Sequence, residues 1–298
     1  MIIANPIYDV VFKRLMENER VARFFIGTML GENVVSLQVK PQEFTYDDRL
    51  AGLAVFRLDF IAIIATDDGQ TKKVLIEIQK AKNEIDLMRF RNYLAEQYKK
   101  QDAVDGKEKV LPITTIYILG FRLLNIATAC IQVERQYRDL IHEGVVLKER
   151  NDFIEKLTHD SYVVQVDRIT DRYQSRLDKL LSLFEQAHFI GDGEIIKEYK
   201  HEADEEEVAI MAGILHHTGT DPETRKEIER EREAWRSVNA MFEEKEKAFR
   251  KTLEQKDEAL AEKDEKLAEK EEALAEKDEK LAEQERIIEA LRQMQKKA

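Results

Sequence analysis

Several residue types that mark other classes of protein are scarce in this chain of 298 residues. Cys130 is the only cysteine, so no disulfide framework can form within the chain, and a reducing compartment such as the cytoplasm fits. No apolar run approaches the 18 residues that suggest a membrane span. The segment 1–10 has neither the basic region nor the long apolar stretch of a secretion signal. We therefore expect a cytoplasmic protein without a membrane span.

Positive charge is also in deficit overall. The formal net charge is -12, with 48 Lys and Arg against 60 Asp and Glu, which is unusual for a protein that binds nucleic acid. The charge is unevenly distributed, however, because residues 71–100 contain eight basic and four acidic side chains. Contact with a phosphate backbone requires a local cationic surface of this kind. The alternative is an ordinary basic face in contact with solvent.

The stretch 55–80, VFRLDFIAIIATDDGQTKKVLIEIQK, organises the expected fold. Two runs rich in Val and Ile flank the loop residues 67–69, Asp-Asp-Gly. This pattern is typical of a β-hairpin with a three-residue loop in which Gly takes the left-handed position. If the hairpin is centred on Asp68, Ile64 lies opposite Lys72. The sequence therefore predicts both the hairpin and its register.

The same register places two acidic residues together. Asp59 lies across from Glu77, and the alternation of side chains puts Gln79 on the same face, whereas the other face is apolar. Like charges directly opposite each other destabilise a sheet, so such a pair needs a compensating cation. A divalent metal is the natural candidate, because Mg²⁺ is typically held by one or two carboxylates together with substrate phosphate. The alternative is a half-solvated sheet whose wet face carries acids that nearby lysines screen.

The segment before the hairpin predicts a helix followed by a strand. Apolar residues recur at helical spacing over residues 6–30, and Pro6 suits a first helical turn. We expect a break near Glu17-Asn18 and an end at Gly31. Residues 34–39 are then typical of the first strand.

Beyond the hairpin, the pattern returns to alternating helix and strand. Residues 83–100 predict a helix with Asn83 as its cap. Residues 102–109 are expected to form a loop, and residues 110–119, VLPITTIYIL, a buried strand. A further strand over 162–166 and a helix over 172–188 complete the expected elements.

The order of these elements, together with several short motifs, resembles the core of the PD-(D/E)xK nuclease superfamily. Within it, the chain is most similar to the Rpn-like family of recombination-promoting nucleases and putative transposases. The resemblance covers about the first two-thirds of the chain. It is carried by NPIYDVVFK at 5–13, LDF at 58–60, IEIQ at 76–79, and Met88-Arg89 with Tyr93. It implies an α/β (α+β) fold with a restriction-endonuclease-like core, in which helices flank a mixed central sheet.

The resemblance also implies a function, that of a Mg²⁺-dependent (or Mn²⁺-dependent) DNA endonuclease that hydrolyses phosphodiester bonds. Asp59 and Glu77 would be catalytic metal ligands, and Gln79 would be the third catalytic residue. Gln79 departs from the superfamily pattern, which has Lys there, and this leaves the usual cationic role unassigned. The alternative is a catalytically inactive nuclease-like scaffold that acts in protein–protein or DNA binding through its C-terminal tail.

Four further residues match family motifs and would support the site. Asp9 and Lys13 belong to the DxVFK motif, although Asp9 could equally answer the dipole of the first helix. Arg89 and Tyr93 are four residues apart, so they share one helical face and could clamp a phosphate. Alternatively, Tyr93 packs over the sheet while Arg89 binds a carboxylate.

The C-terminal region has a composition of its own. Gly219-Thr220-Asp221-Pro222 separates two helices, and neither Gly nor Pro occurs after it. We therefore expect a nuclease-like domain over 1–218, with its core at about 1–125, and a long helix over 219–298. Apolar residues recur there every seventh position, which is typical of a coiled coil: Leu253, Leu260, Leu267, Leu274, Leu281 and Ile288.

The second position of this heptad seam is poor, because acidic residues or lysines occupy it. We expect weak self-association into a homodimer or another homo-oligomer. The alternative is a single solvated helix supported by pairs such as Glu262 with Lys266.

Overall fold

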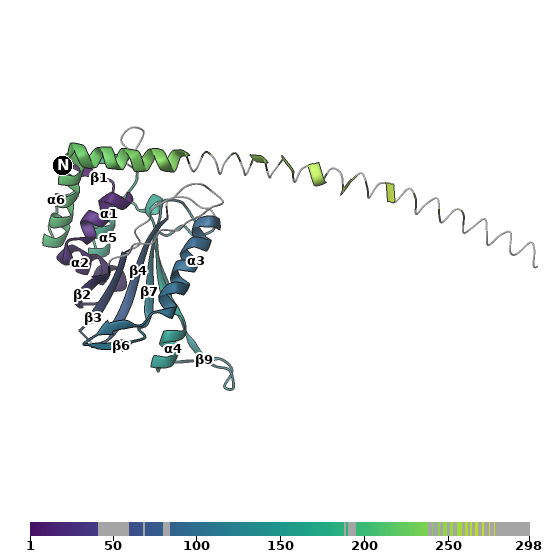
Figure 1. The fold of residues 1–298 in the computed structure, drawn as a ribbon, viewed down its shortest axis with the longest axis horizontal. Coiled ribbons are helices and arrows are strands. Elements are labelled where there is room, and N and C mark those ends of the chain that lie inside the picture. The colour runs from purple at the N-terminus through teal and green to yellow at the C-terminus, as the bar shows by residue number, and fades with distance from the viewer. Residues whose placement is uncertain are drawn as a thin grey trace, which may run out of the picture. The chain divides into compact units, whose positions relative to one another are not determined.

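A six-stranded mixed sheet forms the centre of the fold (Figure 1). The computed structural model describes residues 1–40, 60–67, 69–79, 84–187, 189, 195–237 and short runs between 240 and 277. In spatial order the strands are β2 (Val34–Lys40), β3 (Phe60–Thr66), β4 (Thr71–Gln79), β7 (Ile113–Leu119), β11 (His159–Gln165) and β8 (Cys130–Val133). β4, β7 and β11 are parallel to one another, whereas β2, β3 and β8 each pair antiparallel with a neighbour. The predicted α+β class with a mixed central sheet is confirmed.

The β3–β4 hairpin has the predicted register as far as the structure describes it. Ile64 pairs with Lys72, and Phe60 pairs with Ile76. Gly69 has a φ of 81°, in the left-handed region that its place in the loop requires. Asp59 lies outside the described residues, so its pairing with Glu77 stays a prediction.

Helices cover both faces of the sheet (Figure 1). One face carries the larger apolar core, which α1 (Asp9–Met16), α2 (Glu19–Leu30), α5 (Arg176–Ser182) and α6 (Glu206–Thr220) help to build. α3 (Glu84–Lys99) lies on the opposite face over a smaller apolar cluster. The face that α3 covers contains Glu77, which is 2% exposed, so the alternative of a half-solvated face does not hold at this position.

The helix break and the helix ends follow from local chemistry. The side chain of Asn18 accepts a hydrogen bond from the amide of Val21 at 3.2 Å and caps α2. Gly31 ends α2 with a φ of 68°. The break near Glu17-Asn18 is therefore confirmed, but α1 begins at Asp9 and not at Pro6, because residues 5–8 form a turn.

Three other predicted elements differ from the structure. Residues 102–109 are not a loop but a small hairpin of β5 (Asp102–Val104) and β6 (Lys107–Lys109), with positive φ at both turn residues. The buried strand begins at Ile113, after Pro112. The predicted helix over 172–188 is shorter, because Ser175 and Asp178 form a capping box that starts α5 at Arg176.

The N-terminal strand joins distant parts of the chain. β1 (Ile2–Ala4) pairs antiparallel with β12 (Ile196–Glu198) and contacts α6. After α6, Asp221 caps a following helix over 222–237 by accepting from the amide of Thr224 at 2.9 Å.

The remaining elements flank β11 in the chain, three before it and one directly after it. They are β9 (Tyr137–Asp139), β10 (Val145–Leu147), α4 (Asp152–Leu157) and the short 3-10 helix η1 (Val166–Arg168). β9 and β10 form a two-stranded antiparallel hairpin.

The chain divides into two compact units, Met1–Ala234 and Trp235–Ala298. In the second unit, the described positions are helical, and Leu260, Leu267 and Leu274 are exposed. Leu253, Leu281 and Ile288 lie outside the described residues. No helix in the part of the chain that the structure describes is long and apolar enough to cross a membrane.

Candidate functional site

Glu77 lies near the carboxyl end of β4, a strand with a neighbour on each side. Its side chain shares the α3 face with Leu75, because side chains alternate along a strand. The residue is only 2% exposed. In the parallel register, Tyr117 of β7 lies beside it. Glu77 is therefore a buried carboxylate in the middle of the sheet.

Three aromatic residues lie on the same face of the sheet as this carboxylate. Phe90 and Tyr93 come from α3, and the Phe90 ring lies 4.7 Å from that of Tyr117 and 6.4 Å from that of Tyr93. Burial, with a further contribution from the charge of Glu77, raises the pKa of Tyr117 to about 12. The same two causes raise the pKa of Tyr93 above its ordinary value. Both phenols are therefore neutral at physiological pH.

A second polar cluster lies further along the same face. Lys73, on β4, is buried, and its Nζ is 2.5 Å from Oδ2 of Asp102 and 3.5 Å from the carbonyl oxygen of Gln97. Lys72, on the opposite face of β4, is partly buried and bonds Glu32 at 2.7 Å. We expected residues 71–100 to form a local cationic surface. Lys73 does not contribute to one, because burial and ion pairing remove it from solvent.

On the same face of the sheet, two hydrogen bonds join side chains of β11 to α3 and to β7. The hydroxyl of Tyr98, from α3, lies 2.7 Å from Nδ1 of His159. Thr115 of β7 donates to Ser161 of β11 at 2.8 Å. The α3 side of the sheet thus combines apolar packing with a row of polar groups.

The predicted site residues nearest to Glu77 are described only in part. Asp59 lies outside the described residues. Gln79 ends β4 and Arg89 belongs to α3, but their side chains lie outside the described part of the structure. Tyr93 is 7% exposed and packs over the sheet, which is one of the two arrangements that the sequence left open.

Asp9 and Lys13 lie on the other side of the sheet. Both belong to α1, whose buried residues join the larger core. The amide of Asp9 donates to Oε1 of Glu231 at 3.0 Å, and Lys13 is exposed in the last turn. The structure therefore places these two residues on the face opposite to α3.

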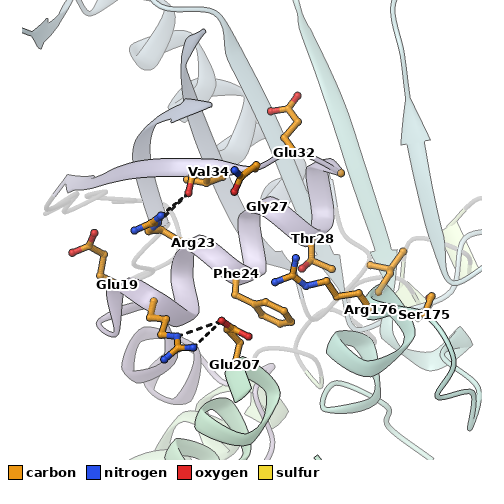
Figure 2. A pocket seen from close by; sticks show the side chains of 14 residues that line it. Glu19, Arg23, Phe24, Gly27, Thr28, Glu32, Val34, Ser175, Arg176 and Glu207 are labelled. Carbon is orange, nitrogen blue, oxygen red and sulfur yellow. Dashed lines mark hydrogen bonds and ion pairs between the residues drawn. The ribbon is translucent and has the colours of Figure 1, made fainter. Parts of the chain in front are cut away.

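A groove of about 1070 Å³ also lies on the α2 side, between α2, the start of β2 and the start of α5 (Figure 2). Its arginines are engaged within the protein. Arg23 donates to the carbonyl oxygen of Val34, and Arg20 bonds Glu207. Arg176 lies over the Phe24 ring, with 4.6 Å between Cζ and the ring centroid. The groove is thus separate from Glu77, which faces α3.

Metal-binding chemistry can be tested against the donors that are present. Within the described residues, no group of three or more His, Cys, Asp or Glu is placed to hold a metal ion. The predicted site needs only two acids, and the described one, Glu77, offers the hard oxygen donors that Mg²⁺ prefers. Tyr117 was not predicted as its neighbour, although its place in the apolar run 110–119 was a signal for a buried strand. No protein-family model, curated protein or solved structure matches this chain.

Proposed function

We propose that the protein is a Mg²⁺-dependent DNA endonuclease of the recombination-promoting nuclease and putative transposase type. The main support is the arrangement of strands around Glu77. β2, β3, β4 and β7 are consecutive neighbours in the sheet, β3 and β4 form the predicted hairpin, and β7 runs parallel to β4 after α3. A helix, three antiparallel strands, a helix and a parallel strand in this order are what the resemblance to a restriction-endonuclease-like core implies.

In this proposal, Asp59 and Glu77 hold one or two Mg²⁺ or Mn²⁺ ions. When bound, the metal supplies a water of lowered pKa and stabilises the charge that develops on the scissile phosphate. Gln79 orients the attacking water or a phosphate oxygen through its amide. Arg89 would bind the DNA backbone, while Tyr93 and Tyr117 keep the surroundings of Glu77 apolar.

The proposal extends to the tail and the partners. The helix over 219–298 would act as a coiled-coil spacer that brings two copies of the chain together, and the two sites would then meet the two strands of a duplex. DNA is the proposed substrate. Asp9 and Lys13 are assigned no contact with it, because α1 lies on the face opposite to α3.

One observation favours the non-catalytic alternative. Glu77 and Tyr93 are only 2% and 7% exposed, so the carboxylate is covered where a nuclease must admit a phosphate. Together with Gln79 in place of a lysine, this burial supports a nuclease-like scaffold that acts through binding and not through hydrolysis.

Plasmid nicking tests the proposal directly. Supercoiled DNA is incubated with the full chain and Mg²⁺, and with Asp59→Asn, Glu77→Gln and the control Glu108→Gln, which alters an exposed acid on β6. We expect at least a 100-fold lower nicking rate for the first two variants, since each removes a metal ligand. The control should nick at the parental rate.

Calorimetric titration with Mg²⁺ or Mn²⁺ separates the two functions. The nuclease requires metal binding that both Asp59→Asn and Glu77→Gln weaken. A parent chain that binds no metal and leaves the plasmid supercoiled would instead assign the protein to the scaffold class.

A further inference from the structure

A segment far from Glu77 exposes an unusual amount of apolar surface. The arm, defined as residues 137–157, contains the β9–β10 hairpin and α4. At the tip of the hairpin, Leu140 and Ile141 are 86% and 89% exposed. On α4, Phe153 and Leu157 lie four residues apart, on one helical face, and are 70% and 60% exposed. Isolated exposed apolar residues are normal, but a group of this size marks an interaction site.

One strand of the hairpin, β10, is apolar on both of its faces. Val145, Val146 and Leu147 form the whole of β10, and all three are exposed. Because successive side chains of a strand point to opposite faces, no single face of the hairpin can be its buried side. A two-stranded hairpin is marginally stable in water without further packing. The arrangement suits an arm that a partner encloses on both faces.

The tip of the arm is held in a defined conformation. Oδ1 of Asp139 accepts from the amides of Ile141 and His142 at 2.9 and 3.2 Å, and the amide of Gly144 donates to the carbonyl oxygen of Asp139 at 2.7 Å. The polar groups of the turn therefore bond one another. What the tip offers to a partner is the pair of apolar side chains, Leu140 and Ile141.

The base of the arm is equally well fixed. Arg135, just before the arm, donates to Asp160 through Nε and Nη2 at 2.8 and 3.0 Å and to Glu155 through Nη2 at 2.5 Å. The hydroxyl of Tyr137 donates to the same Glu155, and Arg150 donates to the carbonyl oxygen of Arg135 at 3.1 Å. This network joins the hairpin to α4 and β11. The apolar surface is therefore presented in advance of binding, which lowers the entropic cost of association.

We infer that the arm is a dimerisation element that packs against the arm of a second copy of this chain. Charge favours this occupant, because the arm contains four Lys and Arg against five Asp and Glu. A nucleic acid or an anionic lipid surface would select an excess of basic residues. A nearly neutral, mixed rim is compatible with an identical surface, as the two-fold symmetry of most soluble dimers requires.

The exposed apolar area of the arm is also close to the area that one partner buries in a standard interface. The seven apolar residues named above expose the equivalent of four to five whole residues. At roughly 150 Å² for each large apolar side chain, this amounts to about 700 Å². Each partner in a standard protein–protein interface buries about 800 Å². The arm alone thus supplies most of one half of a stable interface.

The sheet register separates the arm from the proposed catalytic site. β11 follows the arm and begins at His159, which lies level with Ile113 of β7 and with Lys73 of β4. Glu77 lies four residues further along β4. The proposed dimerisation through the arm therefore uses residues distinct from the proposed catalytic ones.

Sedimentation velocity of the full chain tests this inference. Two series are compared, one with the parental tail and one in which Leu267→Asp and Leu274→Asp disable the tail seam. In each series, the arm variant Leu140→Asp/Ile141→Asp is set against the control Leu124→Asp, which alters a leucine outside the arm that is 77% exposed. Circular dichroism of each variant verifies that these surface changes leave the fold intact.

In the tail-disabled series, we expect a dimer for the parental arm and for Leu124→Asp, and at least a 100-fold higher dissociation constant for the arm variant. A tail-disabled chain that is monomeric with the parental arm would overturn the inference, as would an arm variant that dimerises as tightly as its parent. Co-sedimentation of the monomer with phosphatidylcholine–phosphatidylserine vesicles, lost in the arm variant, would also overturn it and would assign the arm to a lipid surface.

Discussion

The two faces of the central sheet bury different chemistry. Toward α2, the strands present a mainly apolar surface that includes Ala62, Ile64, Val74, Ile76, Ile116 and Ile118, with Thr66 and Thr114 as buried but uncharged polar residues. Toward α3, alternate positions of β4, β7 and β11 are occupied by Lys73, Glu77, Thr115, Tyr117, His159 and Ser161. Several helices cover the first face, whereas α3 packs over a cluster of five buried apolar residues on the second.

This difference separates the parts of the fold that stabilise it from those that can do chemistry. Burying polar and charged side chains costs free energy unless each is paired. A face with so many of them contributes less to stability than an apolar face of the same size. Perturbed ionisable groups are also concentrated at functional sites more often than elsewhere. The α2 face therefore maintains the fold, and the α3 face is where we look for function.

The largest effect should come from a matched pair of truncations. Phe25 is 1% exposed, and its ring lies 5.6 Å from that of Phe12 and 5.9 Å from that of Phe184. Phe25→Ala should lower the free energy of unfolding by about 3–5 kcal/mol, because this dense core cannot close around the cavity. Phe90→Ala, under α3, should cost less, since fewer buried residues surround it. Urea denaturation of both variants measures the difference, and an equal loss would remove the distinction between the faces.

The buried ion pair of the α3 face should give the next largest effect. Asp102→Ala leaves Lys73, with only 2% of its side chain exposed, as an unpaired buried charge. Breaking a buried pair in this way typically costs about 3–5 kcal/mol. The double variant Lys73→Met/Asp102→Ala should recover most of that loss, because it removes both charges.

The same denaturation measurements in a double-mutant cycle check this prediction. The control is Glu206→Ala, which alters an exposed partner of Arg20 on the α2 side and should change stability far less. If the double variant is no more stable than Asp102→Ala, the loss does not come from the charge of Lys73.

The sequence predicted those features of the two faces that depend on residues close together in the chain. The loop with Gly69 set the hairpin register, and with it the face of Glu77, because each residue added or removed would turn the strand over. Asn18 and Gly31 marked the helix ends through their capping preferences. The turn at Asp105-Gly106 was missed, although Asp-Gly between short strands is a hairpin signal that the sequence contained.

Contacts between elements that are far apart in the chain could not be predicted from the sequence in the same way. The polar residues of β4 left a half-solvated face open as an alternative. The structure covers that face with α3 and places β7 parallel to β4. Tyr117 reaches the side of Glu77 only through this register. The pairing of Ile2 with Glu198 joins segments of the first unit that are far apart in the sequence, and neither segment alone specifies it. The surroundings of the site therefore required the structure.

The smallest expected effect is a dependence of stability on pH that arises on the α3 face. His159 lies on the α3 face, and burial, together with the charge of Arg135, lowers its pKa, although Asp160 opposes the shift. The unfolded chain therefore takes up a proton near the ordinary histidine pKa of about 6.5, whereas the folded chain does not. The free energy of unfolding should fall as the pH drops through that value, and the fall should continue down to the lowered pKa of the folded state.

Replacing the histidine with a neutral acceptor should remove this contribution. In His159→Asn, the side-chain amide oxygen can still accept from the hydroxyl of Tyr98, which lies 2.7 Å from Nδ1 in the parent. Urea denaturation at about pH 7.5 and about pH 5.5 brackets the ordinary pKa of histidine. The loss of stability between the two should be smaller in His159→Asn than in the parent. His217→Asn alters an exposed histidine on α6 outside the α3 face and should keep the parental loss. If His159→Asn keeps the full loss, the pH sensitivity of the protein does not come from the α3 face.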